Sequence, residues 1–242
     1  MNTPGSMENP TVSECDAALD ALTVGALFDL THTLCAPLLS SVRDPWEALG
    51  LLKAFILALG KKLPRDEYEQ VGEDVWIARD AHVYDAAYIA GPTIIGHASE
   101  VRPGAFIRGA ALVGEGAVVG NSTELKNCIL FDKVQAPHFN YVGDSILGYK
   151  AHLGAGAVTS NVRSDKKDVV IHAGDQKIAT GLRKLGALVG DKSEVGCNSV
   201  LNPGTVLGRD VIVYPTSCVR GLVPARSIYK NDGAIVARNM ED

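Results

Sequence analysis

One apolar residue recurs at every sixth position through the middle of the chain. The series is Ile77, Val83, Ile89, Ile95, Val101, Ile107, Val113, Val119, Leu125 and Phe131. The residue two places earlier is usually small, which leaves room for a tight corner beside each short strand. A period of six with one inward aliphatic side chain predicts three-sided coils, each burying the apolar row of its neighbour. We therefore expect a mainly β fold, a parallel β-helix over residues 71–225.

The six-residue phase is interrupted once before the coil ends. It returns at Leu147 and Leu153, stops near Arg163, and resumes at Val189, Val195, Leu201, Leu207, Val213 and Val219. The interruption, residues 163–184, contains IHAGDQKIATG, whose alternation and turn residues predict a β-hairpin that projects from the coil. Beyond residue 225 the repeat is lost, so residues 226–242 should form a C-terminal cap or tail.

Residues 1–70 show a helical pattern instead. Apolar residues lie at helical spacing in two groups, Leu22, Leu27 and Leu30, then Leu49, Leu52, Ile56 and Leu59. Asp44 and Pro45 suit an N-cap followed by proline at the first helical position, and Gly60 suits a helix end. We predict a short α-helical N-terminal segment of two or more helices before the coil.

Composition excludes several classes of protein. The formal net charge of −5 is spread along the chain, and no basic run is long enough to favour nucleic acid or a membrane surface. The longest apolar stretch, residues 48–59, is far shorter than the ~20 residues that a bilayer requires. The start of the chain shows no secretory pattern, so we expect a cytoplasmic protein.

The five cysteines suggest neither a metal site nor a redox pair. Their number is odd and no C-x-x-C pair occurs among Cys15, Cys35, Cys128, Cys197 and Cys218. We interpret them as reduced thiols that mostly fill the core. A nucleophilic role for Cys197 is the alternative, but the sequence shows no partner base for it.

A stretch with polar residues, 136–148, interrupts the six-residue apolar repeat of the coil. His138 follows the six-residue position Pro137, so its side chain should point outward. An imidazole with a reference pKa of about 6.5 can take a proton from an attacking amine near neutral pH. The alternative is a histidine of the surface or of a subunit contact.

Four segments carry a resemblance to a known family: RPGAF (102–106), GNSTELKN (120–127), HFNYVGDSILG (138–148) and HLGAGAVTSN (152–161). They resemble the acetyltransferase half of the bifunctional N-acetylglucosamine-1-phosphate uridyltransferase/glucosamine-1-phosphate acetyltransferase. They are still more similar to sugar-1-phosphate nucleotidyltransferases with a hexapeptide C-terminal domain. The resemblance covers about residues 91–230. It implies a left-handed coil, a homotrimer with active sites between subunits, and a role in UDP-N-acetylglucosamine biosynthesis.

The resemblance also implies roles for individual residues. His138 would be the general base in direct transfer from acetyl-CoA, without an acyl-enzyme, and Asn161 would act beside it. Substrate contacts would come from Arg102, Lys126, Tyr141, His152 and Lys167, with the three cations holding a phosphate. Acetyl-CoA contacts would come from Ala155, Cys197 and Lys230. Taken singly, Lys126 and Lys167 would more often be solvated surface residues, and residues 154–156 could be an ordinary corner.

Two departures from the family limit the prediction. The nucleotidyltransferase half and its glycine-rich loop do not appear in this sequence, and the helical segment stands in that place. His152 occupies a position where the bifunctional enzyme has asparagine, which leaves the acceptor sugar open.

The leading hypothesis is therefore acetyl-CoA-dependent N-acetylation of a hexosamine 1-phosphate, with glucosamine 1-phosphate as the first choice. This chemistry needs no metal, although Mg²⁺ could neutralise a bound phosphate. The alternative is a non-catalytic trimeric scaffold, or a partner subunit of a separate sugar-1-phosphate nucleotidyltransferase. A γ-type carbonic anhydrase on the same coil would need three zinc-binding histidines, and the six histidines here contain no H-x-x-x-x-H pair.

Overall fold

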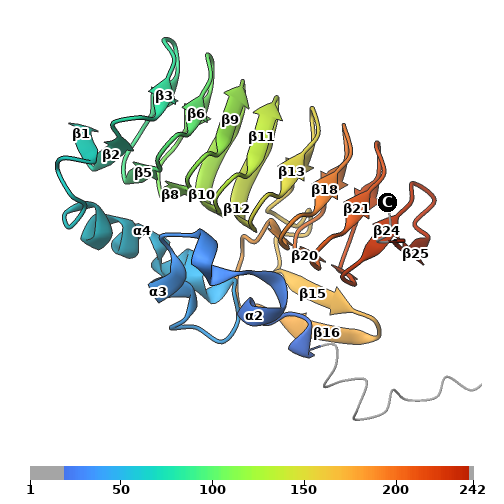
Figure 1. The fold of residues 1–242 in the computed structure, drawn as a ribbon. Coiled ribbons are helices and arrows are strands. Elements are labelled where there is room, and N and C mark those ends of the chain that lie inside the picture. The colour runs from blue at the N-terminus through green and yellow to red at the C-terminus, as the bar shows by residue number, and fades with distance from the viewer. Residues whose placement is uncertain (1–18, 240–242) are drawn as a thin grey trace, which may run out of the picture.

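The computed structural model describes residues 19–239, and most of them form a β-helix of stacked parallel coils. Each coil has three sides, so its strands form three faces along the helix (Figure 1). Face 1 is one sheet of parallel strands, β3 (His82–Val83), β6 (Glu100–Val101), β9 (Val118–Asn121), β11 (Gln135–His138), β13 (His152–Leu153), β18 (Glu194–Val195), β21 (Ile212–Val213) and β24 (Ser227–Tyr229). The expected mainly β coil is confirmed.

Faces 2 and 3 share the second sheet, because two of its strands run through a corner without a break. Those strands are β10 (Glu124–Leu130) and β12 (Tyr141–Leu147). Face 2 is completed by β4 (Tyr88–Ile89), β7 (Phe106–Ile107), β14 (Val158–Thr159), β19 (Val200–Leu201) and β22 (Cys218–Val219). Face 3 is completed by β2 (Val75–Ala78), β5 (Thr93–Ile95), β8 (Ala111–Val113), β17 (Ala187–Val189), β20 (Thr205–Leu207) and β23 (Leu222–Val223).

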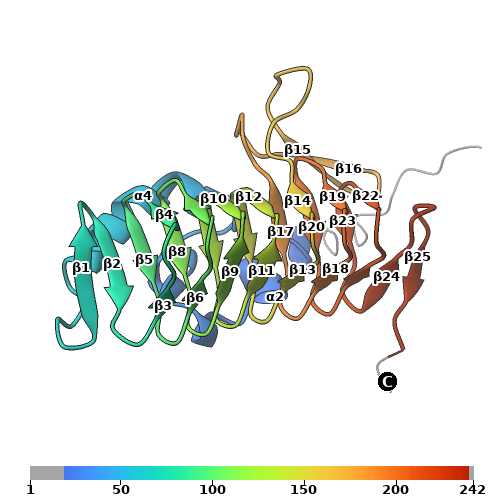
Figure 2. The ribbon, with the colours of Figure 1, turned by 90° about the horizontal axis from the view of Figure 1, so that it is seen from above.

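Both ends of the coil, and the interruption within it, carry antiparallel pairs. At the first coil β1 (Tyr68–Gly72) pairs with β2, and at the last coil β25 (Ile235–Ala237) pairs with β24. The expected C-terminal cap is thus a strand, as far as residue 239. Strands β15 (Val170–Ala173) and β16 (Gln176–Ala179) form an antiparallel hairpin, which lies outside the coils in Figure 2.

The six-residue register slips by one residue at the β10 corner. Leu125 pairs with Ile107, but Leu130 pairs with Val113, so the inward position passes to Leu130 rather than to the expected Phe131. Phe131 is still buried, with its ring centroid 5.2 Å from that of Phe28.

The slip carries over to the coil that bears His138. Ala136 pairs with Val119 and takes the inward position that the sequence pattern assigned to Pro137. The assignment of Pro137 was wrong because a corner one residue shorter shifts every later inward position by one.

Helical elements cover part of face 3. Those with bounds inside the described residues are α2 (Val24–Leu27), the 3₁₀ turn η1 (Leu30–His32), α3 (Ala36–Leu39) and α4 (Glu47–Gly60). The buried side of α4 includes Leu49, Leu52 and Ile56, and the helix packs against β5, β8 and β10. The expected helical segment is confirmed, but α4 begins at Glu47 with Trp46 in the cap position, not at Pro45. Within residues 19–239 no helix is long and apolar enough to span a membrane.

The cysteines divide into two kinds. Cys35 and Cys128 are buried, and burial raises the pKa of the Cys128 thiol to about 12. Cys197 and Cys218 are exposed on the outside of the coil, so the expectation that the thiols mostly fill the core is wrong for these two. Cys15 lies outside the described residues.

Asp191 anchors the helical segment to the coil. Its carboxylate accepts hydrogen bonds from the backbone N–H of Asp29 at 2.7 Å and of Tyr149 at 2.8 Å, and lies 3.4 Å from Arg209 Nε. Its own N–H donates to the Leu27 carbonyl at 3.1 Å. Burial raises the pKa of this carboxyl group, although the two backbone donors and Arg209 oppose that shift. One side chain thus joins segments that are far apart in sequence.

Replacing Asp191 should loosen that junction. We expect Asp191→Ala to lower the free energy of unfolding by about 2–4 kcal/mol, because two N–H groups lose a charged acceptor. Denaturant unfolding measures the change, and limited proteolysis should show earlier cleavage before residue 60. Asp66→Ala, at an exposed carboxylate, is the matched control and should change stability by less than about 0.5 kcal/mol. Equal stability of the two variants would contradict the anchoring role.

Candidate active site

Three of the residues singled out in the sequence stand at equivalent positions of successive coils. The backbone N–H of Gly156 donates to the His138 carbonyl at 3.0 Å, and that of Asn198 donates to the Ala155 carbonyl at 2.8 Å. His138, Ala155 and Cys197 therefore lie in one line along the corner between faces 1 and 2, about 4.8 Å apart from coil to coil. We call this line the His138 edge.

Lys230 lies close to the end of the same line. The Tyr214 N–H donates to the Tyr229 carbonyl at 2.9 Å, which places the next residue, Lys230, at the same corner two coils beyond Cys197. Its backbone closes the turn between β24 and β25 through a bond to the Ala234 carbonyl. The three residues expected to contact acetyl-CoA thus lie on one edge with the expected base.

Asn140 holds the corner in shape. Its buried side chain accepts a hydrogen bond from the His138 N–H at 3.0 Å and donates to the carbonyls of Gly154 at 2.8 Å and Ala157 at 3.1 Å. Glycine is required at Gly154, because an added Cβ would come within 2.6 Å of the backbone of the next coil. The positions of His138 and of the 154–156 turn are therefore coupled through one amide.

The His138 ring itself is free. It is exposed, and within residues 19–239 it makes neither a hydrogen bond nor an ion pair. Ala155, one coil further along the edge, is only partly buried. The edge therefore presents an exposed imidazole one coil from a partly buried alanine.

A second group of polar residues gathers around Asp144 at the corner between faces 2 and 3. The buried carboxylate of Asp144 accepts hydrogen bonds from Lys126 Nζ at 2.9 Å, Asn127 Nδ2 at 2.8 Å and Asn161 Nδ2 at 2.5 Å. These donors come from strand β10 and from the residues after β14. The corner is tight, since Asn127 and Asp144 adopt left-handed backbone conformations with φ of 49° and 47°.

Tyr141 joins this group through Asn161. Asn161 Nδ2 also donates to the Tyr141 hydroxyl at 3.2 Å. Burial, aided by the nearby charge of Glu124, raises the pKa of Tyr141, so the hydroxyl stays protonated near neutral pH. Tyr141 begins strand β12 on face 2, and its phenol lies beside Gly143 and Asn161, next to the Asp144 group.

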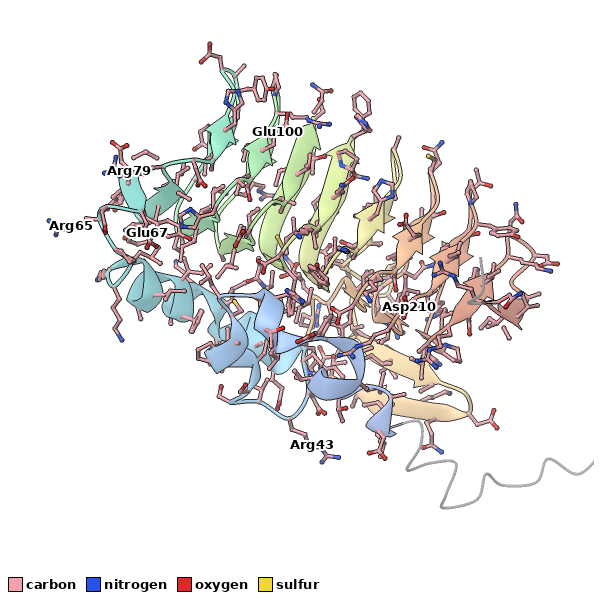
Figure 3. All side chains as sticks on the ribbon, in the orientation of Figure 1. Arg43, Arg65, Glu67, Arg79, Glu100 and Asp210 are labelled. Carbon is pink, nitrogen blue, oxygen red and sulfur yellow. The ribbon has the colours of Figure 1, made fainter. Side chains whose placement is uncertain are left out.

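The three cations expected to hold a phosphate do not meet in one chain. Arg102 forms a 3.0 Å ion pair with Glu100. Glu100 belongs to strand β6 and is labelled in Figure 3. Lys126 is paired with Asp144 as described above. Lys167 lies in the loop before β15, where its backbone N–H donates to Asp165 Oδ1 at 3.2 Å.

His152 also lies apart from the Asp144 group. It starts strand β13 on face 1, pairs with Gln135, and has its Nδ1 2.8 Å from Glu194 Oε2. Within the described range no group of three or more His, Cys, Asp or Glu side chains is placed to hold a metal ion.

Sequence reasoning missed Asp144, Asn127 and Asn140. Asp144 carried a usable signal, because it is an acid in the otherwise apolar or small stretch from Val142 to Leu147. Its partners could not be read from the sequence, since the corner that brings them together is one residue shorter than the repeat predicts.

Comparisons with known proteins agree with this architecture. The family model described as the GMPPB C-terminal domain matches residues 89–181. The bifunctional protein GlmU of Methanococcus maripaludis is 32% identical over 137 residues, which are 56% of this chain and 33% of that protein. A bifunctional sugar-1-phosphate nucleotidylyltransferase/acetyltransferase of Sulfurisphaera tokodaii is 34% identical over 181 residues, 74% of this chain and 45% of that protein.

The solved structures that match this chain do so at lower sequence identity. The acetyltransferase domain of PglB from Neisseria gonorrhoeae, in complex with acetyl coenzyme A, covers 66% of this chain and 56% of its own at 16% identity and a TM-score of 0.32. PerB from Caulobacter crescentus, in complex with CoA and GDP-perosamine, covers 67% of this chain and 57% of its own at 17% identity and a TM-score of 0.33.

The six-residue repeat and the stacked parallel coils make this chain a hexapeptide-repeat β-helix protein. Its coil resembles the C-terminal acetyltransferase domain of the GlmU-like bifunctional sugar-1-phosphate enzymes, as the sequence motifs predicted. The chain spans between a third and a half of the length of these two relatives.

The Asp144 group should be a stabilising unit as well as a candidate site. We expect Asp144→Ala to lower the free energy of unfolding by about 2–4 kcal/mol, because it leaves Lys126 and two amides without their shared acceptor. Asp144→Asn should cost less, since asparagine tolerates the left-handed backbone and keeps an acceptor oxygen. Asp85→Ala, at an exposed carboxylate after β3, is the control in the same denaturant titration. No loss in Asp144→Ala would show that the group contributes nothing to folding.

Proposed function

We propose that this protein is an acyltransferase that moves the acetyl group of acetyl-CoA to the amino group of a hexosamine 1-phosphate. Glucosamine 1-phosphate is the first acceptor to test. The observation that carries the proposal is the His138 edge, where the free imidazole, Ala155 and Cys197 occupy equivalent positions of successive coils. An extended thioester lying along that edge would bring its carbonyl carbon beside a general base.

The chemistry needs one proton acceptor and direct attack. The sugar amine attacks the thioester carbonyl carbon while the His138 ring takes a proton from the nitrogen. Collapse of the tetrahedral intermediate breaks the C–S bond, and the departing CoA thiolate takes up the proton from the imidazolium. Tyr141 and Asn161 would orient the sugar, with the phenol as a neutral hydrogen-bonding group.

Assembly and location follow from the same resemblance. We propose a homotrimer acting in the cytoplasm, with each site completed by a neighbouring subunit. This arrangement would let cations that lie apart in one chain meet in the assembly. The alternative role, a scaffold or partner subunit of a separate nucleotidyltransferase, remains an outcome of the activity test.

The first experiment measures thiol release from acetyl-CoA with glucosamine 1-phosphate, galactosamine 1-phosphate, or no acceptor. Acceptor-dependent release supports the acetyltransferase and ranks the two sugars. If the folded protein releases no thiol with any amino sugar phosphate, the scaffold role is favoured.

Removal of the base should affect turnover and little else. We expect His138→Ala to lower kcat by about 10²–10⁴-fold, the usual contribution of a general base, with unchanged stability because the ring is exposed. The control is His82→Ala, at another exposed histidine of face 1, which should keep wild-type kcat. Wild-type turnover in His138→Ala would rule out this mechanism.

A larger side chain on the edge should obstruct the cofactor. We expect Ala155→Leu to raise KM for acetyl-CoA by about tenfold or more, because the added atoms occupy the space beside His138. Ala54→Leu, on the exposed side of α4, adds the same atoms away from the edge. Equal KM values in the two variants would place acetyl-CoA elsewhere.

A further inference from the structure

One side chain beside the candidate base is held in a backbone conformation that its residue type disfavours. Phe139 follows His138 at the corner between faces 1 and 2, and its φ of 52° is left-handed. Among residues 19–239 it is the one aromatic residue with positive φ. Steric contacts of Cβ oppose this conformation in L-residues, and bulky or β-branched side chains seldom adopt it. Phenylalanine therefore destabilises the corner that it occupies.

The same corner of the neighbouring coils shows which residues this backbone favours. Hydrogen bonds from each coil to the next place five residues at equivalent positions: Ser122, Phe139, Gly156, Asn198 and Thr216. All five have φ between 52° and 72°. The other four are small or polar. The bulky residue thus occurs in the coil that carries the exposed imidazole.

The corner leaves the backbone of Phe139 no room to relax. Its N–H donates to the Asn121 carbonyl at 2.9 Å. The next residue, Asn140, is buried, accepts a hydrogen bond from the His138 N–H at 3.0 Å, and donates its own N–H to Thr123 Oγ1 at 3.3 Å. The chain on both sides of Phe139 is therefore fixed, and the left-handed conformation is a lasting feature of the fold.

Packing within the chain does not account for the ring. Phe139 is 62% exposed, the largest fraction among the large apolar residues of the described chain. Within residues 19–239 neither an aromatic ring nor a cation lies against it. Gly156, at the same corner of the next coil, has no side chain to cover it. An exposed ring in a strained conformation adds no stability by itself, which points to a contact with another molecule.

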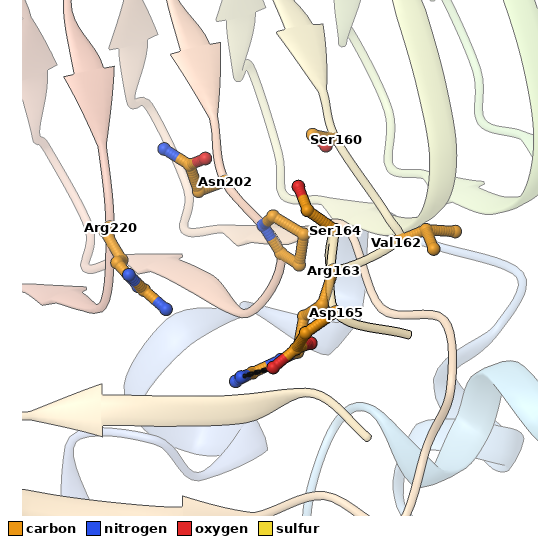
Figure 4. Close-up of a pocket in the computed structure, with 8 residues that line it drawn as sticks. Ser160, Val162, Arg163, Ser164, Asp165, Asn202 and Arg220 are labelled. Atoms are coloured by element: carbon orange, nitrogen blue, oxygen red, sulfur yellow. Dashed lines mark hydrogen bonds and ion pairs between the residues drawn. The ribbon is translucent and has the colours of Figure 1, made fainter. Parts of the chain in front are cut away.

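The amino group of the acceptor must reach the His138 ring, and this limits where the sugar can lie. Consecutive Cα atoms are about 3.8 Å apart, so a pyranose whose amine contacts His138 also lies within reach of Phe139. The polar pocket in Figure 4 is farther away. Its coil-side residues stand one, two and three coils beyond the coil of the base: Ser160, Asn202 and Arg220.

We infer that Phe139 contacts the acceptor, with its ring packed against the C–H groups of the amino sugar. This assignment rests on the proposed acetyltransferase function. The negative face of an aromatic ring suits the weakly positive C–H groups of a pyranose, and the contact removes apolar surface from water. Phe139 lies on the face 2 side of His138, toward Tyr141 and Asn161, the residues assigned to the sugar.

Kinetics test the contact. Phe139→Ala should raise KM for glucosamine 1-phosphate about 5- to 20-fold, the effect of losing one aromatic contact, with KM for acetyl-CoA unchanged. Phe139→Tyr keeps the ring and should keep the wild-type KM. Wild-type KM values in Phe139→Ala would overturn the inference. A rise confined to acetyl-CoA, or a change in oligomer mass by light scattering, would assign the ring to CoA or to a subunit contact and overturn it as well.

A gain in stability together with a loss of binding would separate this role from a structural one. Asparagine tolerates positive φ, so Phe139→Asn should raise Tm by about 2–4 °C while it raises KM for glucosamine 1-phosphate. Thr216→Asn is the matched control, because Thr216 is exposed at the same corner with φ of 62°. It should gain stability with no change in that KM. A lower Tm in Phe139→Asn would show that the ring stabilises the fold, and would overturn the inference.

A binding measurement distinguishes this inference from the proposed function. Glucosamine 1-phosphate should raise Tm of the wild type and of Phe139→Tyr, because a ligand that binds only the folded state stabilises it. The same concentration should raise Tm of Phe139→Ala less. Acetyl transfer by the wild type, with equal stabilisation of Phe139→Ala, would overturn the contact alone. Weaker stabilisation of Phe139→Ala in a protein that acetylates no amino sugar phosphate would overturn the proposed function alone.

Discussion

The stacking of closed coils is the constraint on which the rest of this structure depends. Every coil must turn three corners and return above its predecessor. Only then can its backbone N–H and carbonyl groups form hydrogen bonds with those of the next coil. Residues at equivalent positions are then superposed, whatever their separation in sequence. Ala155 lies beside Cys197 on the His138 edge although the hairpin insertion separates them. The outside of the molecule is therefore organised in columns, and the candidate chemistry lies in two of these.

The most informative departure from regularity is the shortened corner of β10 and β12. Removing one residue there requires left-handed backbone at Asn127 and Asp144, two residue types that adopt it readily. The same contraction turns the Asp144 carboxylate toward Lys126 and Asn161. A local adjustment of the coil thus creates a buried, fully paired polar group beside Tyr141. Within this group the Asp144 carboxylate is paired with the Lys126 ammonium.

The helical segment and the hairpin have different consequences for the candidate site. The helices lie on face 3, fixed by Asp191 and by the Phe28 ring, and leave the His138 edge uncovered. The loop before the hairpin instead forms one wall of the pocket at Arg220. An insertion in a repeat protein can in this way add the wall of a pocket without disturbing the column that faces it.

The sequence by itself determined the coil and the helical segment before it. These features follow from periodicity and turn residues, which are properties of neighbours in the chain. Only the tertiary structure decided that Leu130 replaces Phe131 in the inward row, that Cys197 is exposed, and that Asp144 rather than a ligand holds Lys126. Each of these depends on contacts between coils, and a change of one residue in a corner alters which side chains meet there. The repeat predicts that the coils stack, but the length of each corner decides which residues occupy equivalent positions in neighbouring coils.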